Sequence, residues 1–144
     1  MADPRVPEPA ACDTSSGTYG TNDLAFDADP TMDAVATMAD QAAQAGVRMI
    51  LCLIPPQTRT GETLAYDGYT GDAAVRAWNR DLSLLAAAHG DQVADYDSVL
   101  VNPDGTQNQA LFMPDDGIHP NSAGFAAMWP VLEPLLGADG VAMD

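Results

Sequence analysis

An aspartate and a histidine three residues apart form the most chemically suggestive pair in this chain. Asp116 and His119 lie in the segment Asp-Gly-Ile-His-Pro-Asn-Ser-Ala-Gly, and His119 is one of two histidines in the sequence. In a tight turn this spacing brings a carboxylate to one imidazole nitrogen, which leaves the other nitrogen to take a proton from a nucleophile. The same residues also fit a polar turn that caps the following helix.

A second short segment, Gly20-Thr21-Asn22-Asp23, follows a run of small and β-branched residues. Glycine permits a tight exit from a strand. An asparagine amide held at that point can donate to an oxyanion that develops on a carbonyl. An Asx turn explains the same sequence without any chemistry. Gly20 and Asn22 are therefore candidates for substrate binding and for an oxyanion hole, respectively.

The elements that must position these residues alternate between helices and strands. Apolar residues at helical spacing predict helices, several of them ended by glycine, over residues 30–45, 71–89 and 122–136. A nearly continuous apolar run over 47–54 predicts a buried parallel strand that Pro55 and Pro56 end. A shorter strand is predicted over 93–96, and residues 12–20 fit either a short edge strand or a loop.

This order predicts an α/β fold, a three-layer α/β/α sandwich with a short parallel sheet. Ligands of such sheets bind beyond the carboxyl ends of the strands. If residues 12–20 form a strand, Asn22, Pro55 and the Asp116–His119 turn all fall at that edge. Pro55 is therefore a further candidate for substrate binding. The two polar stretches 57–70 and 101–115 are predicted to be loops.

Charge and cysteine content narrow the expected partners. Five Lys+Arg against 21 Asp+Glu give a net charge of −16, which disfavours nucleic acid and anionic membranes. Cys12 and Cys52 form no CxxC pair, so neither a metal site, a cofactor nor a disulfide scaffold is expected. No signal peptide or membrane-spanning run is visible, so a soluble protein is expected; the compartment stays unknown, with the cytoplasm as the default. We expect one domain over residues 12–144, preceded by a flexible proline-rich arm over residues 1–11.

Together these segments resemble sequence blocks of the SGNH (GDSL-type) hydrolase family. The Gly20–Asp23 segment is similar to the block whose asparagine donates to the oxyanion, and residues 116–125 are similar to the block that supplies the Asp and His of a catalytic triad. The resemblance covers roughly residues 18–136, with the blocks in family order. Further similarities are Leu53-Ile54-Pro55-Pro56, Trp78-Asn79 and Asp95-Tyr96. The resemblance implies a flavodoxin-like α/β/α fold and hydrolysis of short acyl esters, with His119 as general base, Asp116 orienting it and Asn22 in the oxyanion hole.

The chain departs from the family pattern at its start. The family begins with a strand ending in Gly-Asp-Ser, whose serine is the nucleophile, and a second block then supplies an oxyanion glycine. Here 19 residues precede Gly20 and the sequence contains no Gly-Asp-Ser. We therefore expect an SGNH domain without its N-terminal third. Ser15 and Ser16 are candidate replacement nucleophiles if their segment lies beside Asn22, and otherwise belong to a flexible polar stretch.

Two functions follow from this departure. The first is an esterase with a small-molecule ester substrate and a relocated nucleophile. The second is a catalytically impaired remnant that acts as a binding or assembly module. Loss of two strands would uncover a sheet edge and an apolar helix face, so a homo-oligomer is expected. In such an oligomer a neighbouring subunit can supply the nucleophile.

Overall fold

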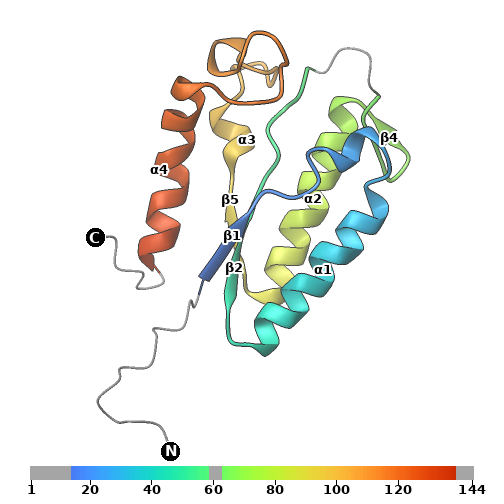
Figure 1. Cartoon of the computed structure of the whole chain (residues 1–144), viewed down its shortest axis with the longest axis vertical. Coiled ribbons are helices and arrows are strands. Elements are labelled where there is room, and N and C mark those ends of the chain that lie inside the picture. Colours follow the sequence, from blue (N-terminus) through green and yellow to red (C-terminus); the bar gives the residue numbers. More distant parts are fainter. Residues whose placement is uncertain (1–13, 59–62, 139–144) are drawn as a thin grey trace, which may run out of the picture.

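A three-stranded parallel sheet with helices on both faces forms the centre of the molecule (Figure 1). The structure, a computed structural model, describes residues 14–58 and 63–138; the proline-rich arm predicted over residues 1–11 lies outside this part. In chain order the elements are β1 (Thr14–Gly17), η1 (Asp23–Ala25), α1 (Asp29–Gln44), β2 (Arg48–Cys52), β3 (Ala65–Tyr66), β4 (Tyr69–Thr70), α2 (Asp72–His89), β5 (Gln92–Ala94), α3 (Tyr96–Val99), η2 (Gln109–Leu111) and α4 (Ser122–Ala138). The strand order β1-β2-β5 and the mixed composition confirm the predicted α/β class.

The central strand β2 is buried on both faces, as its continuous apolar sequence predicted. Met49 and Leu51 pack against α1 and α2 on one face. Ile50 and Cys52 alternate with them and pack against the α4 side. Side chains alternate along a strand, so this single strand joins two hydrophobic layers. Figure 1 shows the result, with α1 and α2 on one side of the sheet and α4 on the other.

Local sequence signals mark the C-terminal end of α2 and the N-terminal end of α1. Helix α2 ends at Gly90, which adopts the left-handed conformation at φ 71° and donates to the carbonyls of the last turn. Helix α1 begins at Asp29 with Pro30 in its first turn. Ala28 occupies the N-cap position and Asp29 is already helical, one residue before the predicted start at residue 30.

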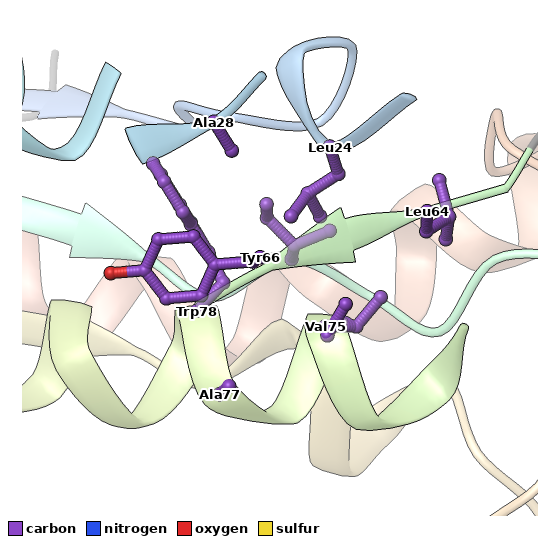
Figure 2. Packing of buried hydrophobic residues seen from close by; sticks show 9 residues of the cluster. Leu24, Ala28, Leu64, Tyr66, Val75, Ala77 and Trp78 are labelled. Atoms are coloured by element: carbon purple, nitrogen blue, oxygen red, sulfur yellow. The ribbon is translucent and has the colours of Figure 1, made fainter. Parts of the chain in front are cut away.

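A third apolar cluster packs against the N-terminal half of α2, where Trp78 is fully buried (Figure 2). Tyr66 packs edge-on against Trp78 with ring centroids 5.2 Å apart, and its hydroxyl donates to Asp81 at 2.9 Å. Tyr66 lies in the β3–β4 hairpin, so the prediction of a loop throughout residues 57–70 was wrong for its second half. Asp67 and Gly68 form the turn with φ of 49° and 78°, which is the two-residue turn that Asp-Gly favours.

Short elements also interrupt the region that follows β5. The predicted strand over residues 93–96 ends at Ala94 because Asp95 caps the short helix α3, accepting a hydrogen bond from the Ser98 N–H at 3.0 Å. The predicted loop over residues 101–115 contains an isolated bridge between Val101 and Gln107 and the single turn η2. In the described part of the chain, no helix has the length and apolar character needed to cross a membrane.

Candidate active site

Asp116 and His119 form a hydrogen-bonded pair in the turn before α4. The Nδ1 atom of His119 lies 2.7 Å from Oδ2 of Asp116. The other carboxylate oxygen, Oδ1, accepts hydrogen bonds from the backbone N–H groups of Ile118 at 2.8 Å and His119 at 3.0 Å. The carboxylate therefore holds both the backbone and the ring of the histidine, as the Asp-x-x-His spacing predicted.

The same contacts keep Asp116 ionised. The backbone N–H of His119, the backbone N–H of Ile118 and the imidazole, in that order, lower the pKa of Asp116 to about 2. A carboxylate against Nδ1 favours the tautomer that carries its proton on this nitrogen, which leaves Nε2 as the base. Nε2 has no hydrogen-bond partner among the residues that the structure describes, and the His119 side chain is 73% exposed. The pair can therefore accept a proton from a group placed at Nε2.

Backbone hydrogen bonds close the turn around the pair. The Met113 N–H donates to the His119 carbonyl at 2.8 Å, and the Gly117 N–H donates to the Met113 carbonyl at 3.4 Å. Gly117 has φ of 64°, and a Cβ at this position would overlap the side chain of Thr58. Glycine is therefore required here both by the backbone conformation and by the close approach of the neighbouring loop.

The N-terminus of α4 is anchored by Asn121. Its Oδ1 accepts the backbone N–H groups of Ala123 at 2.9 Å and Gly124 at 3.1 Å, which is the hydrogen bonding of an N-cap. Its Nδ2 donates to the carbonyls of Ala110 within η2 and of Phe112 just after it. Helix α4 begins at Ser122, the first residue of the helix predicted over residues 122–136.

A small cavity of about 160 Å³ lies beside His119 at the carboxyl ends of β1 and β2. Thr18, which follows β1, and Pro55, which follows β2, both border it. The complete lining is Thr18, Thr21, Pro55, Gln57, Tyr96, Ile118, His119, Pro120, Phe125 and Met128. The position at the edge of a parallel sheet is where α/β proteins bind ligands. Pro55 lies where the sequence predicted, and its role in substrate binding stays a prediction.

The Gly20–Asn22 segment lies next to this cavity but contributes only Thr21 to its lining. Asn22 is exposed and precedes η1, and its assignment to an oxyanion hole stays a prediction. Gly20 is buried with φ of 92°, and a Cβ there would overlap the indole of Trp78. The glycine thus serves the packing of the turn against α2, and its predicted part in substrate binding has no contact in the cavity lining to support it.

Ser15 and Ser16 lie within β1, where their backbones pair with Met49 and Ile50 of β2. Their side chains are outside the described part of the structure, so the prediction that one of them is the nucleophile stays untested. The hydroxyl-bearing residues that border the His119 cavity are Thr18, Thr21 and Tyr96.

Thr18 and Tyr96 also border this cavity; the sequence indicated Tyr96 only through the family resemblance and did not single out Thr18. Burial raises the pKa of the Cys52 thiol, and the side chains of Tyr96 and Thr18 partly offset that rise. The sequence prediction considered only Ser15 and Ser16 as replacement nucleophiles and so omitted Thr18, which follows β1. The signal that could have indicated Thr18 is its place at the end of a strand, because residues there lie at the ligand-binding edge of a parallel sheet.

Solved structures with the same fold are GDSL-type and ester-hydrolase proteins. The chain superposes on an acylhydrolase candidate from Bacteroides fragilis with a TM-score of 0.72 and 22% identity, covering 88% of this chain and 62% of the other. A GDSL-like lipase from Bacteroides thetaiotaomicron gives 0.70 and 21%, covering 88% and 63%. An arylesterase candidate from Agrobacterium tumefaciens gives 0.62 and 19%, covering 88% and 61%. The chain thus spans about three fifths of the length of these structures.

Comparison with curated proteins found no match. A family profile, in contrast, matches residues 9–127, which include both the Gly20–Asp23 segment and the Asp116–His119 pair. Because this match covers well over half of the sequence and agrees with the fold, the chain belongs to the GDSL-like Lipase/Acylhydrolase family.

Proposed function

We propose that this protein hydrolyses acyl esters and that His119 is the general base of the reaction. The observation that carries the proposal is the 2.7 Å contact between Asp116 and Nδ1 of His119, beside a cavity at the carboxyl ends of the strands. Membership of a lipase and acylhydrolase family supports the reaction type. Asp116 remains a carboxylate throughout the pH range in which an imidazole works, because its pKa is about 2.

The proposed reaction has two steps. In the first, Nε2 of His119 removes a proton from a hydroxyl, whose oxygen attacks the ester carbonyl carbon to give a tetrahedral oxyanion. The Asn22 amide is the proposed donor to this oxyanion. Collapse of the oxyanion breaks the bond to the alcohol, which leaves with the proton from His119. In the second step a water activated by His119 hydrolyses the acyl-enzyme and regenerates the hydroxyl.

The nucleophilic hydroxyl is proposed to come from β1 or from the turn after it. Ser15 and Ser16 are the candidates from sequence, and Thr18 and Thr21 border the cavity that contains His119. Labelling with a fluorophosphonate, followed by peptide mapping, separates the four because each gives a distinct modified residue. Absence of a label at all four positions would contradict a covalent mechanism that uses this segment.

The cavity favours a short acyl group. Its apolar side is formed by residues that include Pro55, Ile118, Phe125 and Met128. A volume of about 160 Å³ corresponds to roughly five water molecules at about 30 Å³ each. We therefore propose acetyl and butyryl esters as better substrates than long-chain esters.

Hydrolysis of p-nitrophenyl acetate and butyrate by purified protein tests the proposal. The variant His119→Ala is expected to lose about 10²-fold to 10⁴-fold in kcat/KM, the usual value of general-base catalysis. The matched control is His89→Ala, which removes the other histidine from the far end of α2 and is expected to keep the rate. Equal rates for the wild type and His119→Ala would refute the proposal.

The alternative is a binding or assembly module derived from an esterase. It is supported by the absence from this sequence of Gly-Asp-Ser, the segment that carries the nucleophile in the family pattern. This alternative predicts no hydrolysis that depends on His119 at any pH. The same assay therefore separates the two functions.

We also propose that the protein is a homo-oligomer. Phe125 and Trp129 on α4 are 59% and 45% exposed, which is unusual for two large apolar side chains on one helix. In the described sheet, β1 is an edge strand that pairs only with β2. Light scattering is expected to give a multiple of the 15.0 kDa chain mass, and Trp129→Glu is expected to lower it. A monodisperse wild-type monomer would contradict this assignment.

A further inference from the structure

The side chain of Gln107 connects three loops at the edge of the sheet. Its Nε2 donates to the carbonyls of Pro56 at 2.8 Å and Gly117 at 2.7 Å, and its Oε1 accepts from the Thr58 hydroxyl at 2.9 Å. We propose that Gln107 is a positioning residue for the Asp116–His119 pair. This inference rests on the proposed role of His119 as general base.

The amide of Gln107 has no freedom left to rotate. Both N–H groups and one carbonyl lone pair are used, and the residue is 6% exposed. The two carbonyls that accept its N–H groups lie 51 and 10 residues away along the chain, at Pro56 after β2 and at Gly117 in the Asp116–His119 turn. A buried amide whose donors are all satisfied fixes its partners, because rotation would leave a desolvated donor without a partner.

The contact with Gly117 reaches the acid–base pair through a single peptide group. The Gly117 carbonyl and the Ile118 N–H belong to the same planar peptide unit. Gln107 holds the carbonyl end at 2.7 Å, and the N–H end donates to Oδ1 of Asp116 at 2.8 Å. Rotation of this peptide therefore cannot occur without breaking both hydrogen bonds. By holding the carbonyl, Gln107 directs the N–H at the carboxylate that orients His119.

This peptide is a place where an anchor is needed. It follows Gly117, whose φ is 64°, and glycine permits several backbone conformations at similar cost. The Gly117 carbonyl receives one other hydrogen bond, from the Thr58 N–H at a longer 3.2 Å. Without the Gln107 amide, the turn can flip the 117–118 peptide and withdraw one of the two backbone donors from Asp116.

The test replaces the amide with a group of the same shape. Gln107→Glu exchanges the NH₂ donor for an oxygen and sets a carboxylate against two carbonyls. Gln109→Glu is the matched control, because it makes the same change at an exposed position two residues later. Gln107→Met removes the donors without adding a charge. Circular dichroism and the dispersion of the amide NMR spectrum establish that each variant is folded.

Imidazole ¹⁵N spectra, recorded at a pH where the rings are neutral, give a readout that does not depend on activity. The wild type and Gln109→Glu are expected to show His119 with its proton on Nδ1, whereas both Gln107 variants are expected to shift it toward the Nε2-protonated form. His89 is an internal reference, because its Nε2 contacts Asp40 at 2.6 Å away from this turn. Carboxyl ¹³C titration is expected to show the pKa of Asp116 rising from about 2 toward its ordinary value in the Gln107 variants.

Kinetics complete the test. The Gln107 variants are expected to lose on the order of 10²-fold in kcat, as for a misplaced catalytic group, with KM changed by less than about twofold. Folded Gln107 variants with an unchanged His119 tautomer and an unchanged Asp116 titration would overturn the inference. If the wild type hydrolyses no ester, the proposed function fails, while the spectra still decide whether Gln107 positions the pair.

Discussion

Replacement of Asn79 by leucine is expected to destabilise the protein strongly, although Asn79 lies in the middle of a helix. Its side chain makes two hydrogen bonds to one residue: Oδ1 accepts the Ile54 N–H at 2.8 Å, and Nδ2 donates to the Ile54 carbonyl at 2.8 Å. Ile54 is fully buried at the point where the chain leaves β2. The Asn79 amide thus satisfies the backbone N–H and carbonyl of Ile54, as a neighbouring strand would within a sheet.

The expected magnitude follows from the two backbone groups that Asn79→Leu leaves without partners. Each buried, unsatisfied group costs about 1–3 kcal/mol, or roughly 4 kcal/mol for the two together. The apolar leucine side chain returns about 1 kcal/mol through its own burial. The net loss of about 3 kcal/mol is a large part of a typical unfolding free energy of about 5–15 kcal/mol. At roughly 2–4 °C per kcal/mol, Tm is expected to fall by about 6–12 °C.

Thermal and urea unfolding followed by circular dichroism measure this loss. Gln41→Leu is the matched control, since it adds the same side chain at an exposed position of α1 and is expected to change stability by less than about 0.5 kcal/mol. A Tm of Asn79→Leu within about 2 °C of the wild type would show that water or a backbone shift satisfies Ile54. The reasoning about the exit from β2 would then be wrong.

Three further predictions concern pH and packing. The pKa of Asp116 is about 2, below its ordinary 3.8. The contacts of this carboxylate therefore stabilise the protein fully above about pH 4, and their contribution is lost as the pH falls through 2. The difference in urea stability between the wild type and Asp116→Ala should shrink over that range. Hydrogen bonds that the His89 ring donates to the Asp40 carboxylate and then to a backbone carbonyl raise the pKa of His89 above 6.5. This stabilisation is complete below about pH 6.5 and is lost as the pH rises through the raised value. Asp40→Asn should remove most of that alkaline change in Tm. Gly20→Ala should lower stability by about 3 kcal/mol in urea unfolding, because φ is 92° and the new methyl overlaps Trp78; a change below about 1 kcal/mol would show that the turn relaxes freely.

The parts of the fold that could be predicted have patterns longer than one turn or strand. The apolar run before Pro55 identified β2, and the helical spacing with Gly90 identified α2. The β3–β4 hairpin was missed because its strands are two residues long, too short to show any periodicity. Its packing on Trp78 is tertiary, and only Asp67-Gly68 gave a local signal for the turn.

For the site residues too, what could be predicted depends on how far apart in the sequence their contacts lie. Asp116 and His119 could be predicted because the hydrogen bonds that join them span three residues or fewer. Gln107 has no local signal, since one of its partners lies 51 residues away and its role depends on how three loops meet. The place of Thr18 at the cavity likewise depends on how the Asp116–His119 turn approaches the end of β1.

The short span of the Asp116–His119 contacts has a consequence for partially unfolded states. Closing a turn of a few residues costs little chain entropy, whereas bringing Gln107 to Pro56 requires that the sheet between them be formed. The Asp116–His119 hydrogen bonds can therefore persist in a chain whose sheet has unfolded, but the imidazole then has no fixed orientation relative to the rest of the site. In hydrogen exchange, the Ile118 amide would then be protected by a local equilibrium and the Ile54 amide by global unfolding. The hydrogen bonds within the Asp116–His119 pair are local, whereas the orientation of the pair relative to the cavity depends on the whole fold.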